Sequence, residues 1–383
     1  MTEPAKARRP RSRSKRASTP DAVTPPTGEA PASDLTSPAP EVEASTTPIE
    51  APAAVPTGVR ARRRIVVTGG AGFVGSAVCR VLHERGDQVV ALVRDPGRAG
   101  RLRDLASEGV ELIESDLSDL NRLAADLDAA DAVIHAAGSY RVGITKVERG
   151  AMWDANVGAT TAVLDAAEVA HVPRIVHVST CGVFGDTRGE VVDESFRRDL
   201  RDGFASWYDE TKYGAHEVAE QRIRAGAPVV IVLPSQVYGP GDQSAVGRQL
   251  RQAAAGRLGY TVLDAVGLGF VHVDDLAAGI VATLDRGRAG EAYVLSGPTA
   301  RLRQAIEVAA AVGGHAPPRL RIPTGVLRAL VPIGGLIGRH GLREIVDSGA
   351  GVTYWASSAK AHHELGFSPR GLEEGFRDTF ATP

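Results

Sequence analysis

After Arg62, short apolar runs alternate with longer amphipathic stretches along the chain. The runs are rich in β-branched residues and end at turn-forming residues, which predicts buried strands. These runs cover residues 65–67, 88–93, 110–114, 131–136, 174–179 and 229–233. Apolar positions at helical spacing predict helices over residues 73–85, 119–128, 151–170 and 206–225. Such alternation predicts an α/β fold of the Rossmann type, a doubly wound parallel sheet with helices on both faces.

Residues 1–60 differ in composition from the rest. They contain no Phe, Trp or Tyr and hold eleven of the 23 prolines. Such a segment buries too little apolar surface to offset its conformational entropy, so we predict a disordered tail before a folded domain at 61–383. Seven Lys and Arg residues lie between Lys6 and Arg16. This basic run indicates either a solvated extension or contact with an anionic surface or nucleic acid.

The overall charge and cysteine content exclude several classes of protein. Lys and Arg total 44 against 46 Asp and Glu, so no nucleic-acid partner is expected for the folded domain. The two cysteines are too few for a disulfide framework and fit a reducing compartment, so a cytoplasmic location is expected. No uninterrupted apolar run reaches the ~18 residues of a membrane-spanning helix. The histidines lack metal-ligand spacing, and no metal is expected.

A glycine-rich turn follows the first predicted strand, with the sequence Thr68-Gly-Gly-Ala-Gly-Phe-Val-Gly75. Between a strand and a helix, this pattern is typical of dinucleotide binding. Gly69 permits the tight turn, Gly72 lets the backbone approach the pyrophosphate, and Gly75 lets helix and strand pack closely. The helix that starts at Phe73 and Val74 offers free N–H groups to the diphosphate, so both are candidate cofactor-binding residues.

The residue at the end of the second strand bears on the choice of cofactor. An acid there would bond the ribose hydroxyls of NAD, whereas a cation meets the 2′-phosphate of NADP. Arg94 occupies this position, with Arg98 and Arg101 nearby. We therefore expect NADP to be favoured over NAD. The alternatives are that Arg94 only ends a strand in water and that Asp95 binds the ribose.

Asp116 and Leu117 follow the third predicted strand. A carboxylate at this place accepts a hydrogen bond from the adenine amino group, so both are candidate cofactor-binding residues. The alternative for Asp116 is the N-cap of the next helix.

Tyr208-Asp-Glu-Thr-Lys212 places a phenol and an ammonium on one face of a predicted helix. An unperturbed tyrosine has a pKa of about 10, and bringing it near 7 requires about 4 kcal/mol. The ammonium and a cofactor charge would favour the phenolate. Such a tyrosine exchanges a proton with an alcohol or ketone as hydride moves at the same carbon, and Lys212 holds a ribose hydroxyl. The alternative is an exposed pair without function.

Several motifs occur together in one order. They are Thr68–Gly75, Asp116-Leu117, His135-Ala-Ala-Gly138, Asn156-Val-Gly-Ala-Thr160, Ser179-Thr-Cys-Gly-Val-Phe-Gly185, Tyr208–Lys212, Pro234-Ser-Gln-Val-Tyr-Gly-Pro-Gly241 and Phe270-Val-His-Val-Asp-Asp275. In this order they resemble the extended short-chain dehydrogenase/reductases, also called the NAD-dependent epimerase/dehydratase family. The resemblance covers residues 64 to about 381.

The resemblance implies roles for individual residues. Thr180 would bind the substrate oxygen beside Tyr208; the alternative is a strand-end threonine bonded to backbone. Ala136, Ala137 and Gly138 would line the cofactor, and Pro234 and Val237 would lie near the nicotinamide. The family often forms homodimers through the helices near 151–170 and 206–225.

The resemblance also implies two parts of the folded domain. The cofactor part lies mainly in residues 62–235, and a smaller C-terminal substrate-binding lobe comes mainly from 186–206 and 235–383. Within that lobe, Ile322–Ile337 is apolar but broken by Pro and Gly. It is expected to roof an apolar pocket or form a buried helix, in preference to lying on a membrane.

The chain departs from parts of the family pattern. Cys181-Gly182 follows Thr180 where sugar-nucleotide 4,6-dehydratases carry an Asp-Glu pair, which argues against that elimination. No cation precedes Phe270, and Leu233 replaces the Arg that often precedes the Pro234 position. A pocket without these cations grips a nucleotide-sugar less well. The chain is therefore more similar to the dihydroflavonol-reductase-like and hopanoid-associated branch.

These patterns predict an NAD(P)-dependent oxidoreductase that interconverts a carbonyl and a secondary alcohol of a small-molecule substrate. Thr180, Tyr208 and Lys212 are the expected catalytic residues. One alternative is a nucleotide-sugar epimerase that uses transient hydride transfer. Another is a non-catalytic NAD(P)-binding regulator.

Overall fold

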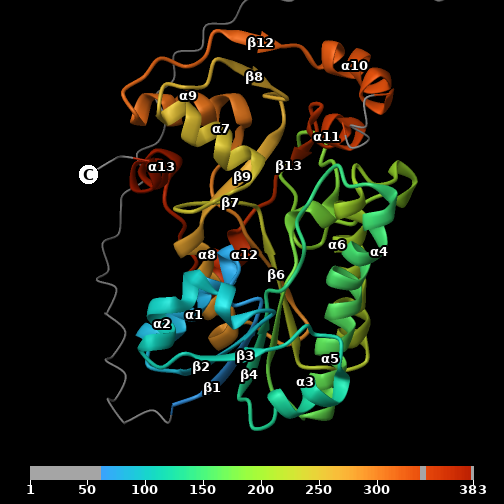
Figure 1. Ribbon diagram of the computed structural model, residues 1–383, viewed down its shortest axis with the longest axis vertical. Coiled ribbons are helices and arrows are strands. Elements are labelled where there is room, and N and C mark those ends of the chain that lie inside the picture. Colours follow the sequence, from blue (N-terminus) through green and yellow to red (C-terminus); the bar gives the residue numbers. More distant parts are fainter. Residues whose placement is uncertain (1–61, 337–341, 381–383) are drawn as a thin grey trace, which may run out of the picture. The chain divides into compact units, whose positions relative to one another are not determined.

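The computed structural model describes residues 62–336 and 342–380, all of which belong to one compact unit. The predicted disordered tail lies outside the described residues. Seven parallel strands form the central sheet in the order β3-β2-β1-β4-β5-β6-β10 (Figure 1). Their bounds are Arg64–Thr68 (β1), Gln88–Val93 (β2), Glu111–Glu114 (β3), Ala132–His135 (β4), Ile175–Val178 (β5), Val229–Pro234 (β6) and Ala292–Leu295 (β10).

The helices cover both faces of this sheet, as predicted for a doubly wound α/β fold. One face carries α1 (Phe73–Glu84), α8 (Val273–Arg286) and α12 (Ala359–Leu365), and the other carries α3 (Leu120–Asp126), α5 (Ala159–Val169) and α6 (Trp207–Arg224). In β1, Ile65 and Val67 enter the first core and Val66 the second. Strands buried on two faces read as continuous apolar runs, which is why the sequence pattern identified them. The short α2 (Arg103–Ser107) follows β2.

The helix predicted at 151–170 contains a wide turn. It consists of α4 (Arg149–Trp153), a π-helical turn at Asp154–Gly158, and α5. Single π turns of this kind often occur at functional sites. The turn here holds Asn156, whose buried side chain reaches the loop after β4.

The C-terminal part adds a smaller lobe with its own core of Tyr238, Phe270 and Phe376. Around its central strand β9 lie β7, β11 and β13, while β8 pairs with β12. The strand bounds are Gln236–Tyr238 (β7), Tyr260–Val262 (β8), Gly267–His272 (β9), Thr299–Arg301 (β11), Leu320–Ile322 (β12) and Thr353–Tyr354 (β13). The helix bounds are Ala245–Ala254 (α7), Leu302–Val312 (α9), Thr324–Leu336 (α10), Leu342–Gly349 (α11) and Leu372–Phe380 (α13).

The apolar stretch Ile322–Ile337 starts at the end of β12 and continues into α10, and Ile337 itself lies outside the described residues. Val326 in α10 is 49% exposed. The expectation that this stretch roofs a pocket or is buried stays a prediction. Among the described residues, no helix has the length and apolar character needed to cross a bilayer.

Candidate active site

The glycine-rich turn brings β1 and α1 closer than any side chain would permit. Gly69 has a φ of +70°, and a Cβ on it would lie 2.7 Å from the backbone of Ala137. A Cβ on Gly75 would lie 2.2 Å from the carbonyl oxygen of Gly69. Gly72 caps α1 without any side-chain hydrogen bond, and the first turn of α1 contains no acid. The N–H groups of that turn, at Phe73 and Val74, are therefore available to an anion.

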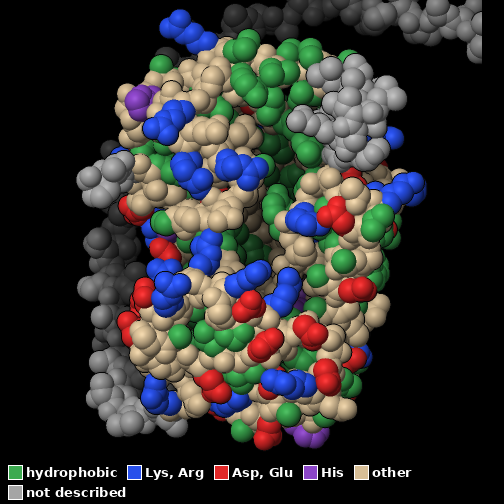
Figure 2. Space-filling view, in the orientation of Figure 1, with side chains coloured by type: hydrophobic (Ala, Val, Ile, Leu, Met, Phe, Trp, Pro, Cys, Tyr) green, Lys and Arg blue, Asp and Glu red, His purple; other side chains and the backbone are tan. Residues whose placement is uncertain are grey.

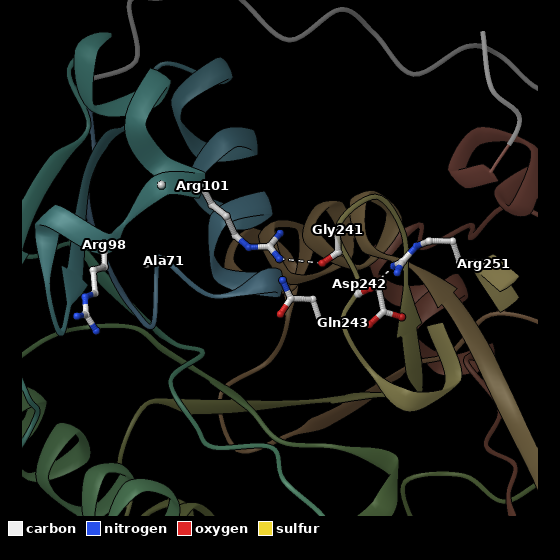
Figure 3. Close-up of a pocket in the computed structure, with 8 residues that line it drawn as sticks. Ala71, Arg98, Arg101, Gly241, Asp242, Gln243 and Arg251 are labelled. Carbon is white, nitrogen blue, oxygen red and sulfur yellow. Dashed lines mark hydrogen bonds between the residues drawn. The ribbon is translucent and has the colours of Figure 1, made fainter. Parts of the chain in front are cut away.

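Beside this turn, a pocket of about 620 Å³ is bordered by Ala71, Arg98, Gly100 and Arg101 on one side and by Gly241, Asp242, Gln243 and Arg251 on the other (Figure 3). The guanidinium of Arg101 lies 5.5 Å from the centre of the Phe73 ring. It donates a 2.8 Å hydrogen bond to the Gly241 carbonyl, which links the cofactor part to the smaller lobe. The pocket is cationic, because Arg98, Arg101 and Arg251 line it against the single carboxylate of Asp242.

Arg94 directly follows the last residue of β2 and is exposed. Asp95 accepts a 2.9 Å hydrogen bond from the Gly97 backbone N–H and lies 3.4 Å from the Arg98 guanidinium. These contacts orient the carboxylate that the sequence offered as an alternative ribose ligand, and its side chain stays half exposed.

Asp116 forms a local turn. Its carboxylate accepts hydrogen bonds of 3.0 Å and 2.7 Å from the backbone and hydroxyl of Ser118, which lower the pKa of Asp116. The N-cap of α3 is Asp119, so the alternative assignment of Asp116 as that cap is wrong. Leu117 has a φ of +62°, an unusual conformation for a leucine, and packs against the second core.

The carboxyl ends of β1, β4, β5 and β6 lie next to one another beside the glycine turn. Ligands bind at this end of the strands in open parallel sheets. After β4, the backbone N–H of Ala137, next to Ala136, donates to the Thr68 hydroxyl. A Cβ on Gly138 would lie 4.0 Å from the Lys212 ammonium nitrogen. Pro234 ends β6, and Val237 in β7 packs against the first core. The carboxyl ends of β4 and β6 therefore carry Ala136–Gly138 and Pro234, whereas Val237 lies in β7, a strand of the smaller lobe.

Tyr208 and Lys212 lie one turn apart near the start of α6, whose N-cap is Ser206. Lys212 is buried and donates a 3.2 Å hydrogen bond to the Val178 carbonyl at the end of β5. Burial lowers the pKa of Lys212 to about 8. The Thr180 hydroxyl oxygen, just beyond β5, accepts a 3.1 Å hydrogen bond from the Gly182 N–H.

The electrostatics of Tyr208 differ from the expectation of a stabilised phenolate. Burial, with the neighbouring Tyr140 and Asp209, raises its pKa above the usual value of tyrosine. The Tyr140 ring meets the Tyr208 ring edge-on, with 4.8 Å between centroids. In the protein without cofactor, Tyr208 is therefore a neutral phenol at physiological pH.

Asn156 lies within one of the sequence motifs, but the sequence predicted no role for it. Its amide oxygen accepts a 2.6 Å hydrogen bond from the Ser139 N–H, and its amide nitrogen donates to Ser139 and to the Thr211 hydroxyl. Asn156 thus ties the loop after β4 to α6, which carries Tyr208. Tyr140 and Asp209 were also missed, because neither residue type nor spacing set them apart.

A hollow opens between the smaller lobe and α6, with hydrophobic side chains along its upper part and Lys and Arg below them (Figure 2).

Residues 65–296 match the model of the NAD dependent epimerase/dehydratase family. The chain belongs to this family.

Members of the epimerase/dehydratase family with known names support this assignment. The chain is 30% identical to a putative dihydroflavonol 4-reductase of Synechocystis sp., over 67% of this chain and 74% of the relative. It is 30% identical to a 2-alkyl-3-oxoalkanoate reductase of Stenotrophomonas maltophilia, over 82% of this chain and 97% of the relative. The crystal structure of gox2253 superposes on this chain with a TM-score of 0.73 and 31% sequence identity. The match covers 84% of this chain and 97% of the gox2253 chain. The predicted similarity to the dihydroflavonol-reductase-like branch is confirmed, and the protein is an enzyme of the short-chain dehydrogenase/reductase type.

The described residues fit the dinucleotide of this family. The uncapped start of α1 suits the diphosphate, and the side-chain-free surface of Gly69 and Gly72 leaves room for it. Lys212 keeps N–H groups beyond the one that bonds Val178, and these suit a ribose hydroxyl.

Gly75→Ala tests the close approach of α1 to β1. The new Cβ would meet the rigid Gly69 backbone, so we expect a loss of about 1–3 kcal/mol in unfolding free energy and at least tenfold weaker NADPH binding. Urea denaturation and fluorescence titration measure both. Gly150→Ala in α4 is the control, because a Cβ there meets nothing within 4 Å, and it should be neutral or slightly stabilising. Equal behaviour of the two variants would contradict the prediction.

Lys212→Met tests the burial of the ammonium. Because the pKa of Lys212 is lowered to about 8, the unfolded chain holds a proton between pH 8 and about 10.5 that the folded protein has released. The unfolding free energy contributed by this group should therefore rise with pH across that window. The difference between wild type and Lys212→Met, measured by urea denaturation from pH 7 to 10, should show this rise. A difference that is flat with pH would show that the ammonium is not desolvated.

Proposed function

We propose that this enzyme interconverts a carbonyl and a secondary alcohol, with Tyr208 as acid–base group, Thr180 as hydrogen-bond donor to the substrate oxygen and Lys212 as ribose ligand. The observation that carries the proposal is the buried Lys212 one turn after Tyr208, bonded to Val178 two residues before Thr180 and close to Gly138. When bound, NAD(P) supplies or accepts the hydride.

The chain's own groups suit the proton side of this reaction. The Gly182 N–H occupies one lone pair of the Thr180 hydroxyl, which leaves the Thr180 proton free for a substrate oxygen. A neutral Tyr208 is the form needed to give a proton to the oxygen during reduction, and its raised pKa keeps it in that form. In the direction of oxidation, Tyr208 must become a phenolate, which a cationic nicotinamide ring and the Lys212 ammonium would favour.

The smaller lobe supports a carbonyl substrate without a nucleotide in preference to a nucleotide-sugar. A Cβ on Gly269, which directly precedes Phe270, would lie 2.2 Å from the Ser296 hydroxyl oxygen. A cationic side chain there would require the buried Ser296 hydroxyl to move. Leu233 is buried in β6, and the relative named as a reductase of 2-alkyl-3-oxoalkanoates also favours a ketone.

Tyr208→Phe should reduce kcat by about 10²–10⁴-fold while NADPH affinity stays within about threefold, because only the proton donor is lost. Turnover is measured as NADPH oxidation with a panel of ketones and nucleotide-sugars. Tyr213→Phe on the same helix is the control and should keep its activity. Unchanged turnover in Tyr208→Phe would refute the mechanism. Conversion of a nucleotide-sugar without net cofactor oxidation would assign the enzyme as an epimerase.

We propose that the preferred cofactor is NADP. Arg94 and Arg98 are exposed beyond β2, and Arg101 borders the cationic pocket beside the glycine turn. Asp95 is engaged by Gly97 and Arg98. Three arginines stand against one carboxylate in this segment, so a 2′-phosphate would meet a net positive charge.

Arg94→Ala should weaken NADPH binding about tenfold or more and leave NADH binding within about twofold, because the guanidinium contacts only the extra phosphate. Fluorescence titration with both cofactors measures this. Arg103→Ala, an exposed arginine on α2, is the control. Wild-type protein that binds NADH tenfold more tightly than NADPH would overturn the assignment.

A further inference from the structure

Asp209 places a carboxylate in the active site that the mechanism above does not use. It is the third residue of α6 and follows Tyr208 directly. Its carboxylate lies close to Gly182, and glycine leaves the space between them open. A methyl carbon built on Gly182 would lie 3.5 Å from the Thr180 hydroxyl oxygen and 3.8 Å from a carboxylate oxygen of Asp209. The proposed oxygen-binding group and the carboxylate therefore border the same small volume.

Three tyrosines lie within electrostatic range of this carboxylate. Burial raises the pKa values of Tyr140 after β4, Tyr208 in α6 and Tyr354 in β13, and the charge of Asp209 raises them further. Tyrosines of three elements therefore lie near Asp209. Of the charged groups near it, Arg198 lowers its pKa and Glu344 of α11 raises it.

The protonation of Asp209 suits proton transfer. Burial raises its pKa to about 6, because hydrogen bonds with Ser206 and the charge of Arg198 offset only part of the desolvation. A group whose pKa lies near the working pH both takes and returns a proton readily.

A structural role for Asp209 leads to other expectations. Ser206 caps α6 by accepting a 3.1 Å hydrogen bond from the Asp209 N–H, and an acid at this position commonly returns a bond to the cap residue. A carboxylate that only caps a helix is stabilised in its charged form by the helix N-terminus. The bonds with Ser206 lower the pKa of Asp209 in this way, but burial raises that pKa by more.

We propose that Asp209 is a second acid–base group, which removes and returns a proton on the carbon next to the carbonyl bound by Thr180 and Tyr208. The proton moves from carbon to the Asp209 carboxylate, and the C–H electron pair becomes a C=C bond. The carbonyl π pair moves onto oxygen, where the hydroxyls of Thr180 and Tyr208 bind the enolate. Return of the proton reverses these changes, and nothing is oxidised or reduced.

This inference rests on the proposed function, because Thr180 and Tyr208 must hold the carbonyl. It adds an activity to hydride transfer: exchange, and therefore epimerisation, at the neighbouring carbon. Its ligand class is a ketone with a hydrogen on that carbon.

Deuterium exchange in D₂O tests the inference. A panel of ketones that includes 4-phenylbutan-2-one is first assayed for reduction with NADPH. Each reduced ketone is then incubated with enzyme and NADP⁺, and loss of its α-proton signals is followed by NMR. Wild-type enzyme should exchange these protons at least tenfold faster than buffer. Exchange should increase as pH rises through about 6, because Asp209 must be ionised to take the proton.

Asp209→Asn should reduce exchange at least tenfold more than it reduces NADPH-dependent turnover. Ser206→Ala is the matched control, because it removes the cap and should lower the Tm without changing the ratio of exchange to reduction. Asp209→Asn should keep or raise the Tm at pH 7, since it removes a desolvated charge, whereas loss of a capping carboxylate would lower it.

The outcomes separate the two proposals. A ketone that is reduced but not exchanged, or exchange that is equal in wild type and Asp209→Asn, overturns the role of Asp209 and leaves the reductase intact. A panel in which no ketone is reduced contradicts the proposed function, and the role of Asp209 falls with it.

Discussion

The arrangement of the site depends on the contact between the start of α1 and the end of β1. The Gly69 carbonyl lies where a side chain of residue 75 would otherwise be, so helix and strand meet backbone to backbone. This contact points the uncapped N–H groups of α1 along the sheet edge where β1, β4, β5 and β6 end. Cofactor groups, Thr180 and the start of α6 then share one small region. A wider crossing would separate the diphosphate site from the reacting groups.

Burial governs the charges in this region more than pairing does. Lys212 lies inside the protein and bonds only a backbone carbonyl among the described residues, while Tyr208 is held as a neutral phenol. The expectation that Lys212 lowers the tyrosine pKa does not hold for the protein alone, because burial, Tyr140 and Asp209 all raise the pKa of Tyr208. The positive charge of an oxidised nicotinamide would favour the phenolate. In the proposed mechanism, oxidation therefore requires the charge of the bound cofactor.

Much of the cofactor part was predictable because its strands are buried on two faces and its turns need glycine. The first six strands lie where the apolar runs predicted them. The seventh, β10, was missed because segments of the smaller lobe between β6 and α8 interrupt the alternation of strands and helices before it. The π-helical turn that positions Asn156 leaves no trace in hydrophobic spacing. In the sequence, Asp209 resembles any acidic residue in the first turn of a helix. Its position is defined by its proximity to Gly182, which is distant in sequence. Contacts of this kind come from tertiary packing, which local patterns do not encode.

The space beside Gly269 restricts how this pocket can diverge. Because a Cβ on residue 269 would lie 2.2 Å from the Ser296 hydroxyl oxygen, any side chain there requires that hydroxyl to move or to be lost. Ser296 is itself buried, so a change at residue 296 alone brings no new ligand contact. A lineage that starts from this sequence would therefore need coordinated changes at residues 269 and 296 before it could gain a cation beside Phe270.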